Sequence, residues 1–166
     1  MEEKICLAPN CTFGDTEILG NGPRGLAVSD DNSTLYVANF LDDAVYVVNL
    51  VLDTVTTSIP VAHQPTSVVI TPDRSKIYVS SESKTITEID PDINMVVDTI
   101  TTPFFPIELA ITPDGSSIYV AYEVDNSVSE LDTETNMIVE TILVGQTPSG
   151  IAVSPDVSIG VCMGCQ

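Results

Sequence analysis

The chain has no tryptophan, a single histidine and few basic residues. Lysine and arginine together number 5 against 24 acidic residues, which gives a formal net charge of -19. Because like charges repel, nucleic acid and anionic lipid headgroups are not expected as partners. The one histidine, His63, cannot form a histidine-rich metal cluster.

Long apolar runs are also missing. No stretch approaches the roughly 18 to 20 uninterrupted apolar residues of a membrane span, so membrane insertion is not expected. The first ten residues, MEEKICLAPN, lack the basic start and the apolar run of a signal peptide. No export signal is therefore visible in this chain.

What the chain does contain is a repeat of about 42 residues. Four prolines, spaced by 42, 41 and 42 residues, each open a similar passage: Pro23, Pro65, Pro106 and Pro148. The repeat predicts one domain over residues 1–166 with three complete units, 23–64, 65–105 and 106–147. Residues 1–22 and 148–166 remain as two incomplete pieces.

Each complete unit predicts four short strands. β-Branched and aromatic residues dominate its apolar runs, and no window has a sustained helical period, so the chain is expected to be nearly all β. Pro72-Asp73, Pro113-Asp114 and Pro155-Asp156 fall between the first and second strands. Proline presets a turn dihedral and aspartate bonds its own backbone, so Asp73, Asp114 and Asp156 are predicted to form turns.

Three passages carry a resemblance to a known family. They are TLYVAN (34–39), KIYVSS (76–81) and SIYVAY (117–122), and the segment TILVGQTP (141–148) preserves a further part of the pattern. These residues resemble the YVTN β-propeller repeat, which occurs in surface-layer proteins and in relatives of lactonases and amine dehydrogenase subunits. The resemblance implies a propeller of four-stranded antiparallel blades, and it implies function less firmly.

The two incomplete pieces predict a fourth blade that is split between the ends of the chain. Aligned on the repeat, residues 3–8 take the place of its third strand and residues 11–19 that of its fourth. Residues 148–166 supply a first strand and a second. If one chain joins its own halves, a four-bladed monomer results. If neighbouring chains join theirs, a ring or a growing fibre results.

All four cysteines lie in this split blade, and the complete units contain none. Three pairings are open for Cys6, Cys11, Cys162 and Cys165. Disulfides that join the two halves are the preferred prediction, because they would staple the closure. A four-thiolate zinc site is the alternative that the Cys162-x-x-Cys165 spacing suggests, and free thiols are the third.

No pattern of catalytic residues stands out. His63 would have to serve alone in any nucleophile-histidine pair, and it is more simply a loop residue before Pro65. Propeller enzymes gather groups around the central channel, where this chain places Arg24, Thr66, Ile107 and Ser149. Those side chains suit acid-base chemistry poorly, so the chain is predicted not to be an enzyme and to need no cofactor.

Acidic pairs between the third and fourth strands leave weak calcium binding open. The pairs are Asp90 with Asp92 and Asp132 with Glu134. Calcium favours several such oxygens, yet no EF-hand pattern is present and aspartate at these places also suits a plain turn. Weak calcium binding and a plain turn therefore both stay open as interpretations of these acidic pairs.

The leading functional hypothesis is a non-catalytic structural or interaction module, extracellular or on a cell surface. It would form a homo-oligomer or fibre through its terminal strands, with cell-surface or matrix molecules as further partners. Two alternatives are a monomeric four-bladed propeller that binds a ligand and a fragment of a lactonase-like propeller enzyme. The sequence does not identify the ligand.

Overall fold

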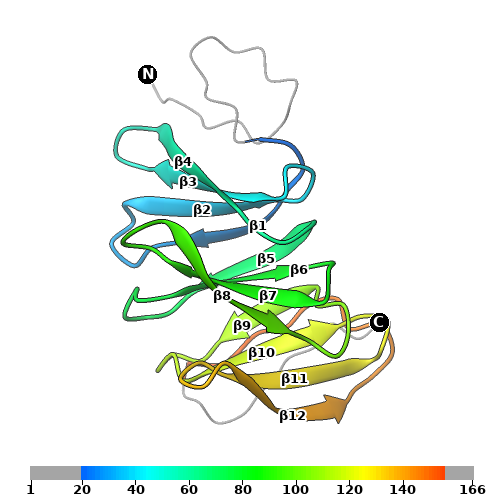
Figure 1. The fold of residues 1–166 in the computed structure, drawn as a ribbon. Coiled ribbons are helices and arrows are strands. Elements are labelled where there is room, and N and C mark those ends of the chain that lie inside the picture. The colour runs from blue at the N-terminus through cyan, green and yellow to red at the C-terminus, as the bar shows by residue number, and fades with distance from the viewer. Residues whose placement is uncertain (1–19, 156–166) are drawn as a thin grey trace.

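The computed structural model describes residues 20–155, which form twelve strands in three separate sheets. In each sheet the four strands pair antiparallel in chain order (Figure 1). The first sheet holds β1 (Pro23–Val28), β2 (Thr34–Asn39), β3 (Ala44–Asn49) and β4 (Thr54–Pro60). The second holds β5 (Pro65–Ile70), β6 (Ile77–Ser81), β7 (Thr85–Asp90) and β8 (Met95–Thr101). The third holds β9 (Glu108–Ile111), β10 (Ser117–Tyr122), β11 (Ser127–Asp132) and β12 (Met137–Leu143).

The all-β prediction and the three units of four strands are thus confirmed for the described residues. None of these residues belongs to a helix that could span a membrane. Residues 148–155, where the repeat predicts the first strand of the split blade, do not form a strand. The rest of the split blade lies mostly outside the described residues, so its existence and the number of blades stay predictions.

The turns between first and second strands are built as the sequence predicts. Asp73 Oδ1 accepts the backbone N–H of Ser75 at 3.0 Å, and Asp114 Oδ1 accepts that of Ser116 at 3.1 Å. The residue after each of these aspartates has a positive φ, 59° at Arg74 and 76° at Gly115. Asp73 and Asp114 are therefore confirmed as turn residues, and Asp156 lies outside the described residues.

Acid should loosen these turns. Hydrogen bonds, from the side chain of Thr71 foremost, lower the pKa of Asp73 from 3.8, and those from Thr112 foremost lower that of Asp114. A lowered folded pKa stabilises the fold above the unfolded value, and this stability is lost as pH falls through the folded value. We expect the melting temperature to fall from about pH 4 downward, and the fall to be smaller in D73N/D114N. Thermal melts followed by circular dichroism between pH 7 and pH 2 measure this difference. A melting temperature that falls equally in both proteins, or in neither, would refute the contribution of the two aspartates.

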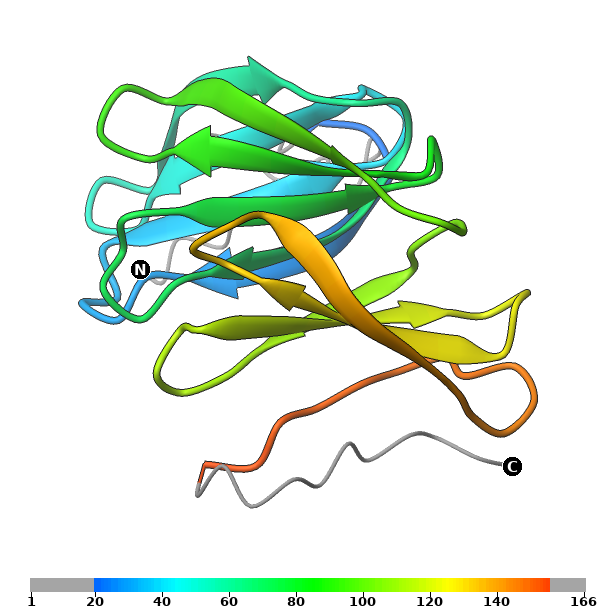
Figure 2. The same cartoon turned by 60° about the horizontal axis from the view of Figure 1, so that its bottom comes forward.

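The sheets are stacked one behind another, with the second between the other two (Figures 1 and 2). Strand β5 contacts both β1 and β9, so the first strands form one side of the stack. We call the side of a sheet that looks toward the next sheet in chain order its forward face and the other its rear face. Alternation along each strand supplies apolar residues to both faces, as the two-residue period of a strand requires.

Two apolar cores join the sheets. The forward face of the first sheet packs against the rear face of the second through residues that include Tyr36, Val45 and Ile59. The forward face of the second packs against the rear face of the third through residues that include Ile86, Ile100 and Leu109. Burying one such aliphatic side chain stabilises the fold by about 1.5 to 3 kcal/mol, so these cores hold the stack together.

The two ends of the stack lack such packing. Ile59 and Ile100 are 3% and 7% exposed on the forward faces of their sheets, whereas Ile142, at the same position of the third sheet, is 46% exposed. At the other end, Leu26 is 50% exposed on the rear face of the first sheet, while its equivalent Val68 is 4% exposed. The described residues therefore do not close into a ring, and the stack has two open blade-like faces.

Candidate functional site at the junctions between sheets

A polar clamp joins the second and third sheets beside their apolar core. The side-chain amide of Asn136, in the turn between β11 and β12, reaches back to the second sheet. Tyr78 O–H donates to Asn136 Oδ1 at 3.0 Å. Asn136 Nδ2 donates to Glu88 Oε2 at 2.5 Å and to Asp98 Oδ2 at 2.8 Å. The side-chain amide of Asn136 thus forms hydrogen bonds with one hydroxyl and two carboxylates, which lie on three adjacent strands.

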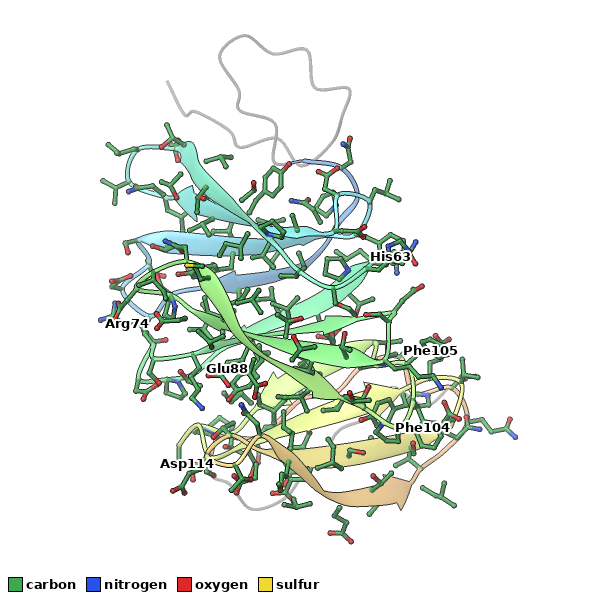
Figure 3. All side chains as sticks on the ribbon, in the orientation of Figure 1. His63, Arg74, Glu88, Phe104, Phe105 and Asp114 are labelled. Atoms are coloured by element: carbon green, nitrogen blue, oxygen red, sulfur yellow. The ribbon has the colours of Figure 1, made fainter. Side chains whose placement is uncertain are left out.

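The register of the second sheet creates this clamp. Tyr78 on β6 pairs with Glu88 on β7, and Glu88 pairs with Asp98 on β8, so the three side chains share the forward face. Asn136 has a φ of 56°, a left-handed conformation that asparagine tolerates better than most residues. In Figure 3 Glu88 lies on the side of the second sheet that looks toward the third.

Lys76 balances the negative charge of the clamp. Its Nζ lies 3.5 Å from Glu88 Oε1 and donates to the backbone carbonyl of Thr133 at 2.7 Å. Burial, with added repulsion from Glu88 and other carboxylates, raises the pKa of Tyr78. Tyr78 therefore stays protonated and acts as a hydrogen-bond donor.

The third sheet carries a tyrosine and two acidic residues at the same positions of its open forward face. Tyr119, Glu130 and Glu140 pair across β10, β11 and β12 as Tyr78, Glu88 and Asp98 do across β6, β7 and β8. In place of Lys76 stands Ser117, which donates to Glu130 Oε1 at 2.7 Å. Burial raises the pKa of Tyr119, and Glu130 and Glu140 raise it further. Within the described chain, nothing donates a hydrogen bond to Glu140.

The first sheet has no such clamp. The positions of the two acids are occupied by Val47 and Thr57, next to Tyr36. Asn94, the counterpart of Asn136 in the second sheet, has its buried Oδ1 without a partner among residues 20–155. Among the three sheets that the structure describes, only the second and third therefore carry the acidic acceptors.

Asn39 marks the open rear face of the first sheet. It is fully buried, yet neither atom of its side-chain amide has a partner within residues 20–155. Its equivalent in the second sheet, Ser81, donates to the backbone carbonyl of Ala62, in the segment that enters that sheet. A side chain at Gly20, in the corresponding segment before the first sheet, would meet Asn39 Nδ2 at 2.8 Å. Asn39 thus points to the chain that enters the first sheet.

The rim opposite the Asn136 clamp is tied together by the loops that carry His63. Asp43 Oδ1 accepts the backbone N–H of Gln64 at 2.8 Å, and Asp43 lies 3.0 Å from Nδ1 of the exposed His63. In the third unit, Asn126 Oδ1 accepts the backbone N–H of Thr147 in the same way, at 2.7 Å. His63 is therefore part of a loop contact, as Figure 3 also shows at the edge of the sheets.

Two of the four predicted channel positions, Arg24 and Thr66, are used for packing, whereas Ser149 is exposed. Arg24 lies over the ring of Phe40, 3.6 Å from its centre, and 3.7 Å from Glu82. Thr66 is buried and its Oγ1 lies 2.9 Å from Ser80 Oγ. These contacts assemble no acid-base pair, but the prediction that the chain is not an enzyme stays a prediction.

The predicted calcium ligands each serve their own turn. Asp90 Oδ1 accepts the N–H groups of Asp92 and Ile93, and Asp132 Oδ1 accepts those of Glu134 and Thr135. No group of three or more potential metal ligands occurs in the part of the chain that the structure describes. The two acidic pairs are therefore not brought together into one site.

Calcium removal should leave the fold unchanged. Because backbone N–H groups already occupy Asp90 and Asp132, we expect EDTA and 5 mM calcium, roughly the range at which weak extracellular sites fill, to give the same melting temperature. Scanning calorimetry with matched ionic strength measures this. A rise in melting temperature with calcium, absent in D90N/D132N, would show that these loops bind the ion.

Cys6, Cys11, Cys162 and Cys165 all lie outside the described residues. Their pairing, and the choice between disulfides, zinc and free thiols, stays a prediction.

Comparisons with known proteins agree with this architecture. The family model described as YNCE-like beta-propeller matches residues 21–159. The chain belongs to the YNCE-like β-propeller family. The propeller prediction is thus confirmed, and each sheet is a blade, while the narrower YVTN resemblance stays a prediction. Curated protein sequences give no match.

Among solved structures, the propeller is similar to a chain of Kuenenia stuttgartiensis hydrazine synthase. The two are 29% identical with a TM-score of 0.78, and the match covers 81% of this chain. It covers 40% of the hydrazine synthase chain, so this chain spans less than half of that protein's length.

Proposed function

We propose that this propeller chain is a non-catalytic structural or interaction module that associates with copies of itself. Neighbouring chains complete the split blade between the third blade of one and the first blade of the next. The observation that carries this proposal is the pair of open faces, marked by Ile142 and Leu26, whose equivalents are buried inside the stack. Each open face repeats a surface that already binds a neighbouring blade within the chain.

The energetic reason for self-association is the free-energy cost of leaving the apolar side chains of both open faces in water. Five large apolar side chains lie exposed on these faces or beside them on the edge strand: Leu26, Val28, Val139, Ile142 and Leu143. Covering apolar surface yields about 25 cal/mol per Å². An interface that is not self-complementary closes into a ring when its rotation permits and otherwise grows into a fibre.

The cysteines support an extracellular or cell-surface setting. Cysteines cluster in both halves of the split blade, where disulfides would lock the assembly in an oxidising compartment. The strongly acidic composition suits a solvated surface.

Electron microscopy of the purified chain tests the proposal. We expect closed rings or fibres that persist without reducing agent. Dispersed single chains at micromolar concentration would overturn it.

A second candidate is a part of a larger propeller enzyme, which the similarity to a chain of hydrazine synthase favours. In that case further blades of another origin cover the open faces. The purified chain would then stay monomeric, and its open faces would be covered only when those blades are added.

A further inference from the structure

We propose that Lys76 and Asn136 join in a spontaneous isopeptide bond, which ties the second blade covalently to the third. Lys76 immediately precedes β6, and Asn136 lies in the turn between β11 and β12. The new bond runs from Lys76 Nζ to Asn136 Cγ, and Asn136 Nδ2 leaves as ammonia. Both residues belong to one chain, so this inference goes beyond the proposed self-association and does not depend on it.

The carboxylate of Glu88 brings the two reacting groups together. Its Oε1 lies 3.5 Å from Lys76 Nζ, and its Oε2 accepts a hydrogen bond from Asn136 Nδ2 at 2.5 Å. Lys76 Nζ also donates to the backbone carbonyl of Thr133 at 2.7 Å, in the turn that carries Asn136. An amine and an amide held on one carboxylate are positioned before they react, which removes much of the entropic part of the barrier.

Tyr78 activates the carbonyl group of the amide. Its O–H donates to Asn136 Oδ1 at 3.0 Å, and negative charge develops on this oxygen when an amine attacks Cγ. Tyr78 is fully buried and Glu88 is 7% exposed. Burial disfavours both an ammonium and a carboxylate, so it favours transfer of a proton from Lys76 to Glu88. The site therefore supplies a nucleophile, a proton carrier and a donor to the developing oxyanion.

The proton balance of the step closes without an added reagent. Glu88 takes one proton from the Lys76 ammonium, and the neutral amine attacks Asn136 Cγ. In the tetrahedral intermediate a second proton passes from Nζ to Nδ2 through the Glu88 carboxyl group. The Cγ–Nδ2 bond then breaks, ammonia leaves, and the new amide keeps one N–H. Glu88 ends protonated, so the cation and one carboxylate are neutralised together.

The other described blades lack part of this set. At the position of Lys76, the third blade has Ser117 and the first blade has Thr34. The first blade also has Val47 at the position of Glu88. Within residues 20–155, only the junction between the second and third blades therefore combines the lysine, the acid and the asparagine.

Mass spectrometry of the denatured full chain tests the bond. We expect a mass lower than the sequence mass by one ammonia, no tryptic cleavage after Lys76, and a branched peptide that links Lys76 to Asn136. The variant K76R keeps the cation but lacks the primary amine, so it should have the full mass of its sequence. K84R is the matched control, because Lys84 follows the other end of β6 and lies over the ring of Phe105. It should still lose ammonia.

Two further variants test the roles of Glu88 and Tyr78. E88Q keeps the shape of the side chain but carries no proton, so the reaction should slow at least about a hundredfold, and Y78F should slow it at least about tenfold. The cross-linked fraction is followed from the start of cell-free synthesis, with circular dichroism to show that each variant folds. Transfer of the wild-type chain to urea early in the time course should stop the reaction, because only the fold brings the groups together.

Three results would count against the proposal. A folded wild-type chain that keeps its full sequence mass after prolonged incubation, with normal tryptic cleavage after Lys76, would overturn it. A loss of ammonia that persists in K76R would place the reaction at another residue and would also overturn it. Cross-linking of E88Q at the wild-type rate would exclude Glu88 as the proton carrier.

Discussion

The variant N136D should melt well below the wild-type chain at pH 7. The substitution replaces a donor with a carboxylate between Glu88 and Asp98, whose oxygens lie 2.5 and 2.8 Å from the native amide nitrogen. Hydrogen bonds to charged groups contribute roughly 1.5 to 3 kcal/mol each, so a loss of about 3 kcal/mol is expected. For a domain of this size the melting temperature should fall by roughly 6 to 12 °C.

The pH dependence of N136D distinguishes repulsion from a general loss of packing. Glu88 and Asp98 raise the folded pKa of the introduced carboxyl, so its destabilising effect is present above the ordinary aspartate value of about 4. The effect fades as pH falls through the raised folded value. The difference from wild type should therefore shrink between pH 7 and pH 4.

A matched control for N136D exists in the same blade. N126D makes the same chemical change at another residue with positive φ, where only an acceptor for the N–H of Thr147 is needed. Asp43 performs this task in the first unit. We expect N126D to change stability by less than about 0.5 kcal/mol. Equal losses in the two variants would contradict the clamp.

The variant G25A should separate the first two blades. A Cβ at Gly25 would lie 2.7 Å from Ser67 Cα and 2.9 Å from Val68 N, both in the backbone of β5. Backbone atoms cannot swing aside as a side chain can, so β1 and β5 must move apart. Overpacking of this kind costs about 1 to 3 kcal/mol, which urea unfolding of the dilute chain would measure.

Gly150 provides the control for G25A. It occupies the same place after its repeat proline, yet a Cβ there would meet no atom of residues 20–155 within 4 Å. Replacing a glycine in a compatible conformation restricts the unfolded chain, so G150A should be neutral or slightly stabilising in dilute solution. An unchanged G25A would mean that the contact between β1 and β5 is looser than the structure shows.

The repeat made most of the fold predictable. Proline spacing located the units, the apolar alternation located four strands in each, and aspartates such as Asp73 and Asp114 located the turns. These features depend on neighbours within a few residues, which a sequence displays directly. The strand order then followed from short hairpin connections.

The polar clamp could not be predicted in the same way. Asn136 and Glu88 are 48 residues apart, and their contact depends on which faces of two blades meet. A trace of it was present in the sequence, since Glu88 and Asp98 recur as Glu130 and Glu140 while the first unit has Val47 and Thr57. Only the register of the strands shows that these acids are paired. The open faces likewise depend on blade packing, which exposes Ile142 while it buries Ile100.

The mass of the chain in solution tests the central claim most directly. If neighbouring chains complete the split blade, light scattering of the native protein at micromolar concentration should give a multiple of 17.7 kDa. The mass should fall with dilution unless intermolecular disulfides hold the assembly. A single species of 17.7 kDa at every concentration would contradict self-association.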